Sequence, residues 1–366
     1  MAEEEIQMVA NEYRLQEINK KISEKTAEEN ICDTPEYLAL EKKRQELFKE
    51  KVRMQDQKRM INTAKRREAR GEHLRDEVIK AVKEAIPTKP LISYEKYKTD
   101  NSQNEAALLL SDWHIGQNTH NRMNVFNDTE LRNRILQLIV RTQEYCKLHK
   151  VKKLHIFALG DLVNGLIHVT TRINNEENVV QQTVKASVKL TEIIETLSTS
   201  VPEVHVYFSR GNHDRINAKM KENIDEESFF DLVQYIVAEK FAGRKEIICH
   251  ENKEDPEIVI AEIAGHLTLA EHGHKDKPQK AAQRLNNFLR TSPDFIFLGH
   301  YHSGAELEEN GTEVIVNGSL CGTDAFASSL RKNSQAVQKL MIINPAGRLC
   351  TYNIALNEKY KGVKPE

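Results

Sequence analysis

The sequence has few cysteines and no long apolar run, and each absence excludes a class of protein. Its five cysteines, at positions 32, 146, 249, 321 and 350, are widely spaced and form no C-x-x-C pair. Such a set excludes a disulfide framework and a cysteine-based zinc knuckle, and it is typical of a reducing compartment. The longest aliphatic stretches, such as residues 106–110, are far below the roughly 18 residues of a membrane span. No basic stretch followed by an apolar one opens the chain, so we expect a cytoplasmic protein that does not bind a membrane.

The chain also lacks an overall excess of charge, because 53 Lys and Arg residues are balanced by 55 Asp and Glu residues. The net charge of −2 excludes the strongly cationic field of a nucleic-acid packaging protein. The charge is nevertheless uneven, since residues 1–40 carry a net −6 and residues 41–70 a net +7. Opposite charges favour antiparallel packing of the two segments, within one chain or between chains. The basic segment 41–70 has two interpretations, a solvated helix face or an arm that contacts the phosphates of a nucleic acid.

Glycine and proline are scarce in residues 1–86, which contain only Gly71 and Pro35. This region is rich in Glu, Lys, Arg and Gln, which favour helices. Thr34 and Pro35 fit the cap and the first residue of a second helix. Apolar residues recur every seven positions in that helix, at Leu40, Leu47, Met54 and Ile61. We therefore predict a helical hairpin or coiled coil over residues 1–86, which forms a homo-oligomer or binds a partner protein, and then a linker over 87–104.

From residue 105 to residue 355, short apolar runs alternate with amphipathic stretches, and a tail of residues 356–366 follows. The apolar runs predict strands at 106–111, 153–159, 203–209, 246–250, 257–263, 266–271, 294–298, 312–317, 336–343 and 348–354. The amphipathic stretches predict helices at 128–149, 176–199, 226–242 and 278–291. Strands and helices alternate in the first half, which favours a parallel sheet, whereas the last third is nearly all strand. The sequence predicts an α/β sandwich with a second, more antiparallel sheet.

Asp, Asn and His residues directly follow five of the predicted strands. Ligands of open α/β sheets bind outside the carboxyl ends of the strands, so these side chains mark a candidate site. The five segments read Asp112-Trp113-His114, Gly160-Asp161, Gly211-Asn212-His213-Asp214, His272-Gly273-His274 and Gly299-His300-Tyr301-His302. Any one segment alone fits an ordinary turn, but five of them, each after a strand, indicate a functional site.

The order of these segments, D-x-H, G-D, G-N-H-D, H and G-H-x-H, resembles that of the calcineurin-like metallophosphoesterases. The resemblance covers residues 105–355 and implies a four-layer α/β/β/α sandwich with two divalent metal ions. It favours Mn²⁺, with Fe²⁺, Zn²⁺ or Mg²⁺ as alternatives. It further implies that one metal is held by Asp112, His114, Asp161 and His302. The second metal would be held by Asp161, Asn212, His272 and His300, so that Asp161 bridges the two ions.

The same resemblance implies hydrolysis of phosphodiesters by in-line attack of a hydroxide that bridges the two metals. His213 matches the general acid of the family, which protonates the leaving oxygen. We expect Asp214 to orient the imidazole of His213 and to raise its pKa. His274 follows His272 by two residues and faces the same side of an extended segment. It either contacts the metal or the phosphate, or has a structural role only.

The loop after Asp161 contains residues that help to identify the class of substrate. DNA repair nucleases of the SbcD type carry a histidine three residues after this aspartate. This chain has Asn164 there, which donates a hydrogen bond to a phosphate but cannot carry a proton. His168 and Arg172 lie further along the loop and are candidates for binding a phosphate. The run from Gly160 to His168 also resembles the corresponding segment of phage metallophosphoesterases.

Three functions fit these features. The first is a metal-dependent DNA nuclease, either an exonuclease or an endonuclease, with the basic segment 41–70 as a substrate arm. The second is a phosphodiesterase or phosphatase for a small nucleotide, in which the N-terminal helices serve oligomerisation. The third is a metal-stabilised scaffold without enzymatic activity. A scaffold has no need of a general acid such as His213, and we predict the nuclease.

Overall fold

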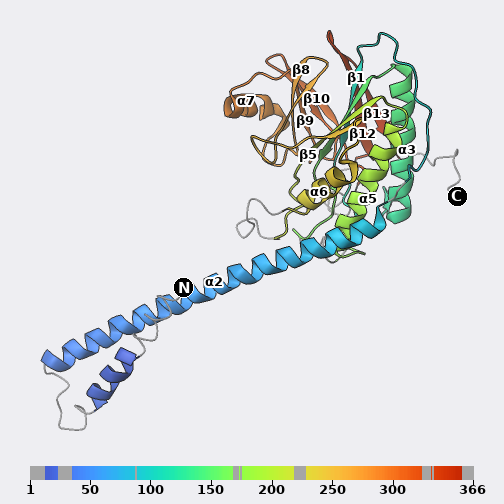
Figure 1. Cartoon of the computed structure of the whole chain (residues 1–366). Coiled ribbons are helices and arrows are strands. Elements are labelled where there is room, and N and C mark those ends of the chain that lie inside the picture. Colours follow the sequence, from blue (N-terminus) through green and yellow to red (C-terminus); the bar gives the residue numbers. More distant parts are fainter. Residues whose placement is uncertain are drawn as a thin grey trace. The chain divides into compact units, whose positions relative to one another are not determined.

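The computed structural model describes residues 13–23, 35–86, 89–167, 173, 175–217, 228–323, 331 and 334–356 (Figure 1). The chain divides into two compact units, Met1–Arg75 and Asp76–Glu366. Each unit has an apolar cluster of its own.

The first unit is built from two helical segments. Residues 13–23 are helical, and helix α2 (Pro35–Ala85) begins at the proline that is expected to open it. Ile18 and Ile22 of the first segment are buried against Leu47 of α2. This apolar contact within one chain agrees with the helical hairpin, whereas association with a second chain stays a prediction. Thr34, the expected cap, lies outside the described residues.

The second unit contains a six-stranded sheet in the order β13-β12-β1-β4-β5-β6. Strands β1, β4, β5 and β6 are parallel, and β12 and β13 extend the sheet by antiparallel pairing. Parallel neighbours need long crossover connections, which explains why strands alternate with helices in this part of the sequence. The strands are β1 (Glu105–Leu110), β4 (Lys153–Leu159), β5 (Glu203–Ser209), β6 (Ile247–Cys249), β12 (Val337–Asn344) and β13 (Gly347–Ala355).

A five-stranded sheet has the order β10-β11-β9-β8-β7, in which β8, β9 and β11 are parallel and the two edge strands are antiparallel. Its strands are β7 (Val259–Ile263), β8 (His266–Glu271), β9 (Phe295–Leu298), β10 (Ala305–Glu309) and β11 (Thr312–Val316). The sequence pattern does not predict β10, nor the short pair β2 (Thr119–His120) and β3 (Val125–Phe126).

The two sheets pack face to face, and helices cover their outer faces (Figure 1). The core between the sheets includes Leu109, Phe157 and Tyr207 from the first sheet and Phe297 and Ile315 from the second. Helices α3 (Asp128–Leu148), α5 (Val179–Ser198) and α6 (Phe229–Phe241) lie along the first sheet, and α7 (Pro278–Leu289) packs on the second. The four-layer α/β/β/α sandwich implied by the resemblance is confirmed.

The boundary between the two units differs from the one expected near residue 86. Val78 and Val82, in the last turns of α2, are fully buried against Leu232 and Ile236 of α6. The following segment is tied to the same unit, because the amide of Leu91 donates a hydrogen bond to Oγ1 of Thr196 at 3.1 Å. The amide of Tyr94 donates to Oγ1 of Thr199 at 3.0 Å, and the hydroxyl of Tyr97 donates to the carbonyl of Val151 at 2.8 Å. The last turns of α2 and the expected linker therefore belong to the second unit.

Helix α2 is 51 residues long, but charged side chains are frequent along it. None of the helices in the described part of the chain is both long and apolar enough to span a membrane.

Candidate metal centre

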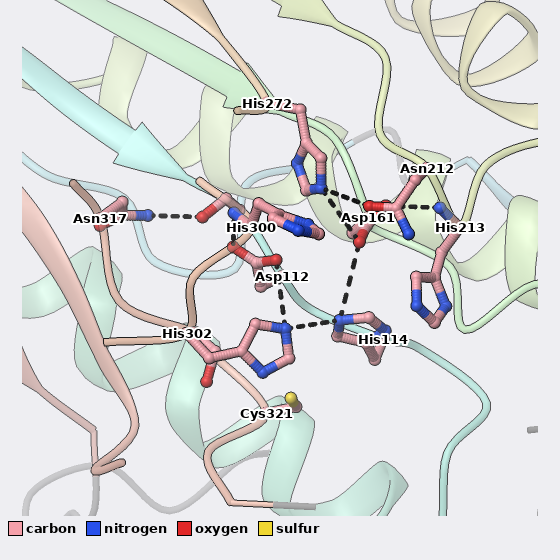
Figure 2. A network of polar contacts seen from close by, with 12 residues as sticks. Asp112, His114, Asp161, Asn212, His213, His272, His300, His302, Asn317 and Cys321 are labelled. Atoms are coloured by element: carbon pink, nitrogen blue, oxygen red, sulfur yellow. Dashed lines mark hydrogen bonds and ion pairs between the residues drawn. The ribbon is translucent and has the colours of Figure 1, made fainter. Parts of the chain in front are cut away.

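Five loops converge at one edge of the sandwich. Three of them follow the neighbouring parallel strands β1, β4 and β5, and two follow the neighbouring parallel strands β8 and β9. Parallel strands present their carboxyl ends at one edge, so these loops bring together the side chains that we expect to bind metal (Figure 2). The seven side chains are those of Asp112, His114, Asp161, Asn212, His272, His300 and His302.

The backbone at this edge is unusual, because five of the seven residues have a positive φ angle. The five angles are 54° at Asp112, 48° at His114, 51° at Asp161, 68° at His300 and 58° at His302. Residues other than glycine rarely adopt this left-handed conformation, which costs of order 1–3 kcal/mol each. Such strain persists where the surrounding structure enforces it, and it is concentrated here at the candidate ligands.

The first donor group comprises Asp112, His114, Asp161 and His302. The Nε2 atoms of His114 and His302 lie 3.2 Å apart. Nε2 of His302 lies 3.3 Å from Oδ1 of Asp112, and Nε2 of His114 lies 4.0 Å from Oδ2 of Asp161. Nitrogen and oxygen atoms from three loops thus point into one small space, as the ligands of a cation do (Figure 2).

The second donor group comprises Asp161, Asn212, His272 and His300. Nε2 of His272 lies 3.1 Å from Oδ2 of Asp161 and 3.1 Å from Oδ1 of Asn212. Nδ1 of His272 donates to the carbonyl of Leu159 at 2.7 Å, which fixes the orientation of the ring. One ligand atom each of Asp161, His272 and His300 lies within 4.8 Å of the others. Because Asp161 belongs to both groups, its carboxylate is placed to be shared by two cations.

Nδ1 of His114 is buried without a hydrogen-bond partner, and Oδ1 of Asp112 is buried with Nε2 of His302 at 3.3 Å. Burial of a carboxylate costs free energy, and a cation beside the Asp112 carboxylate lowers that cost. Carboxylate, imidazole and amide donors together suit Mn²⁺, Fe²⁺ and Zn²⁺. The side chains present therefore fit two divalent metals, whose identity stays a prediction.

The two carboxylates of the centre are held in their ionised form. Burial alone would raise the pKa of Asp112, but the charge and the hydrogen bond of His302, together with the charge of His272, outweigh burial and lower this pKa to about 2. Burial also opposes ionisation of Asp161, yet the charges of His272 and His213 keep the pKa of Asp161 well below its ordinary value. Both aspartates thus carry the negative charge that a metal ligand requires.

The histidines fall into two classes. Burial lowers the pKa of His114 to about 3 and that of His300 to about 4, which keeps both rings in the neutral form that binds metals. Burial has the same tendency at His272, but the charge and the hydrogen bond of Asp161, together with the charge of Asp112 and the hydrogen bond to the Leu159 carbonyl, override it and raise the pKa of His272 to about 10. The middle of the centre, where Asp161 lies, therefore favours positive charge.

His213 is fixed beside the first donor group. Its amide donates to Oδ1 of Asp161 at 2.7 Å, and its ring lies edge-on to His114 with the ring centroids 4.5 Å apart. Nδ1 of His213 lies 2.9 Å from the carbonyl oxygen of Asn164, which can only accept a hydrogen bond. Nδ1 therefore carries a proton.

The expectation that Asp214 orients the imidazole of His213 is wrong. Oδ2 of Asp214 accepts from the amides of Asp161 at 2.9 Å and Gly211 at 2.7 Å, and its Oδ1 has no hydrogen-bond partner. Burial, reinforced by the charge of Asp161, raises the pKa of Asp214 to about 7. Asp214 joins the backbones of two ligand loops, and the carbonyl of Asn164 has the orienting role instead.

Asn164 is buried, and its Nδ2 donates to Oδ1 of Asn175 at 2.7 Å, so the amide braces the loop. A contact between this amide and a phosphate stays a prediction. His168 and Arg172 lie outside the described residues. His274 is close to the second donor group, with its ring centroid 5.6 Å from that of His272 and 6.3 Å from that of His300. A contact between His274 and the substrate stays a prediction.

Sequence reasoning missed a sixth loop, which follows β11. One ligand atom each of Cys321, His114 and His302 lies within 4.8 Å of the others. In the same loop, Nδ2 of Asn317 donates to Oγ of Ser111 at 2.9 Å, next to Asp112. The sequence does predict the strand at 312–317, so the residues that follow it could have been counted with the other loops. The structure shows that β11 is parallel to β9, which places its carboxyl end at the same edge of the sheet.

Comparisons with known proteins agree with this geometry. Residues 107–304, more than half of the chain, match the family model described as calcineurin-like phosphoesterase. The SPbeta prophage-derived uncharacterized protein YonJ of Bacillus subtilis (strain 168) is 24% identical over 330 residues, which cover 87% of this chain and 81% of that protein.

Similar solved structures include a conserved uncharacterized protein of Streptococcus pneumoniae TIGR4, described as a predicted phosphoesterase. It is 13% identical, and the match covers 71% of this chain and 95% of that one with a TM-score of 0.33. A novel archaeal phosphodiesterase is 14% identical, with 68% and 99% of the two chains covered and a TM-score of 0.34. Since all seven candidate ligands lie inside the residues that match the family model, the chain belongs to the calcineurin-like phosphoesterase family, whose members are metal-dependent hydrolases.

Proposed function

We propose that this protein is a dinuclear metal phosphodiesterase that cleaves DNA. The observation that carries the proposal is the shared position of Asp161, whose carboxylate belongs to both donor groups. Oδ2 of Asp161 lies 3.1 Å from Nε2 of His272 in the second group and 4.0 Å from Nε2 of His114 in the first. Two divalent cations held in this way neutralise the oxygens of a phosphodiester and make a water molecule more acidic.

The protein side chains have distinct parts in the proposed reaction. Asp112, Asp161 and the histidines hold the cations, and Asn212 adds an oxygen donor without a negative charge. In the imidazolium form of His213 the second proton lies at Nε2, because Nδ1 already donates to the carbonyl of Asn164 at 2.9 Å. In our proposal this Nε2–H donates to the oxygen that leaves phosphorus, which is general acid catalysis.

The basic segment 41–70 supports DNA over a small nucleotide as the substrate. Its net charge of +7 stands against a net −2 for the whole chain. In helix α2, the side chains of Lys42, Lys49, Arg53 and Arg59 are exposed. A row of exposed cations on a helix suits a polyanion, because each phosphate contact releases counterions.

The first experiment measures cleavage of labelled single-stranded and double-stranded DNA with added Mn²⁺, and compares the wild type with His213→Ala. We expect metal-dependent cleavage that falls by about 10²–10⁴ in the variant. His120→Ala, which replaces an exposed histidine, is the matched control and keeps full activity. Intact DNA together with hydrolysis of bis(p-nitrophenyl) phosphate would refute the nuclease and favour a small-nucleotide phosphodiesterase.

The second experiment tests the basic segment in the full-length chain by changing Lys42, Lys49, Arg53 and Arg59 to Gln. We expect weaker DNA cleavage that depends less steeply on salt, because fewer counterions are released. Hydrolysis of bis(p-nitrophenyl) phosphate should be unchanged, since this small substrate has no polyanionic tail. Equal DNA cleavage by the wild type and the variant at every salt concentration would show that the segment is not a DNA arm.

A further inference from the structure

Cys321 lies beside the first donor group, although no cysteine is part of the ligand pattern that the sequence suggests. Its Sγ atom and one ligand nitrogen each of His114 and His302 lie within 4.8 Å of one another. Cys321 is only 1% exposed. Figure 2 shows its sulfur atom facing the two imidazoles from the side opposite to Asp161 and His272.

The backbone of Cys321 is fixed from both sides. The amides of Leu320 and Cys321 both donate to the carbonyl of Asp112, at 3.2 and 3.3 Å. The carbonyl of Cys321 accepts from Arg134 and from Asn124, each at 2.8 Å. Arg134 is 3% exposed, so a buried, charged side chain holds the backbone at Cys321 in place.

The neighbouring polar atoms point to a cation next to this thiol. Asp112 is fully buried, and its Oδ1 lies 3.3 Å from Nε2 of His302, which belongs to the same group of possible metal ligands as Cys321. The Sγ–H group donates to the carbonyl of Gly322 at 3.4 Å. The sulfur thus lies near side chains that suit a metal.

Cys146 shows what a cysteine with a purely structural role looks like in this chain. It is fully buried in helix α3, where a small apolar side chain fits the packing. Among the described residues, Cys146 belongs to none of the groups of side chains that could hold a metal ion. Burial alone therefore does not explain why Cys321 lies beside two candidate metal ligands, His114 and His302.

We propose that Cys321 is a fifth protein ligand of the cation held by Asp112, His114, Asp161 and His302. The inference rests on the proposed metal centre and adds a donor to it. Thiolate donors favour Zn²⁺ and Fe²⁺, whereas carboxylate and carbonyl donors suit Mg²⁺ and Mn²⁺. The first donor group then prefers a softer metal than the second group, which has imidazole, amide and carboxylate donors only.

The test uses Co²⁺ as a spectroscopic probe of the full-length, metal-free protein. Cobalt bound by any protein ligands gives visible d–d absorption, and a sulfur ligand adds a charge-transfer band in the near ultraviolet. We expect both signals in the wild type and only the visible absorption in Cys321→Ser. Cys249→Ser replaces a half-buried cysteine in β6 and serves as the matched control, which keeps both signals.

Metal preference gives a second readout. Cys321→Ser should weaken Zn²⁺ binding by about tenfold or more, at least as much as loss of an outer-shell partner does, and change Mn²⁺ binding much less. X-ray absorption of the zinc-loaded wild type should show a sulfur neighbour at about 2.3 Å, a measurement that does not require the variant to fold.

The outcomes separate this inference from the proposed function. Visible cobalt absorption without the sulfur band in the wild type would overturn the role of Cys321 and leave the metal centre intact. Failure of the wild type to bind Co²⁺ or Zn²⁺ at all would overturn both. Loss of the band in Cys249→Ser instead of Cys321→Ser would place the sulfur ligand elsewhere and refute the inference.

Discussion

The carboxylate of Asp161 leaves no room for a side chain at position 211. An ideal Cβ atom on Gly211 would lie 2.2 Å from Oδ1 and 2.3 Å from the amide nitrogen of Asp161. Contacts below 3.0 Å with backbone cannot be relieved by rotating a side chain, so the loops after β4 and β5 need glycine where they touch. The pattern G-N-H-D predicts a turn at this point, but only the structure shows that the glycine makes room for the shared ligand.

We expect Asp214 to stabilise the site by accepting hydrogen bonds from two backbone amides. Asp214→Ala would leave two buried amides, those of Asp161 and Gly211, without an acceptor, at a cost of roughly 1–3 kcal/mol each. Asp214→Asn keeps an oxygen in place and should retain most of the stability and activity. Urea denaturation and phosphodiester hydrolysis of both variants test this expectation. If Asp214→Asn abolishes activity while its stability matches the wild type, the carboxylate takes part in the reaction itself.

At the scale of single residues, the seven candidate ligands were predictable because each follows a predicted strand. The positions of Asp214 and Asn164 were not, because both depend on hydrogen bonds between different loops. The carbonyl of Asn164 lies 2.9 Å from Nδ1 of His213 and orients its ring, and no pattern of side chains in the sequence reveals this contact. Sequence motifs identify side chains, whereas the partners of backbone groups become visible only in three dimensions.

Among the secondary-structure elements, those with a strong apolar pattern were predicted and the polar ones were missed. Strand β1 is buried at all six positions, from Glu105 to Leu110, and its apolar run is plain in the sequence. Strand β10 (Ala305–Glu309) is an edge strand with three glutamates in five residues and no buried position, so it lacks the pattern of a strand. Charge on an edge strand hinders pairing with other chains, which explains both its composition and its absence from the prediction.

The last turns of α2 should contribute to the stability of the second unit. Val82→Ala removes two methyl groups from a fully buried position against α6, which we expect to lower the free energy of unfolding by about 2 kcal/mol. Val125→Ala makes the same change at a residue that is 44% exposed and should cost less than about 0.5 kcal/mol. Chemical denaturation of both variants provides the measurement. Equal losses would mean that the α2 contact adds nothing to the second unit.

On the scale of the whole molecule, the two sheets of the sandwich are linked through Glu105, away from the candidate metal ligands. Oε2 of Glu105 accepts hydrogen bonds from Nε2 of His155 and from the amide of Ala264, both at 2.9 Å. Glu105 and His155 lie in the first sheet, and Ala264 lies in the turn between β7 and β8 of the second. A single carboxylate thus links the two sheets.

This link predicts a dependence of stability on pH. Burial acts to raise the pKa of Glu105, but the hydrogen bonds from His155 and Ala264 outweigh it and lower the pKa to about 2, against 4.5 for an ordinary glutamate. The stabilisation is therefore complete above about pH 4.5 and is lost as the pH falls towards 2. Glu105→Gln should be less stable than the wild type at pH 7, and the difference should shrink at low pH. Urea denaturation across this range checks the trend, and a constant difference would contradict it.

The left-handed backbone at Asp112, His114, Asp161, His300 and His302 has a consequence for protein engineering. A designer who copied only these five side chains onto ordinary loops would place them on right-handed or extended backbone, from which the same rotamers aim elsewhere. The transferable unit is a strand together with the turn that follows it, and no single point mutation in an unrelated scaffold supplies that turn. Transplanting this centre therefore means transplanting pieces of the fold.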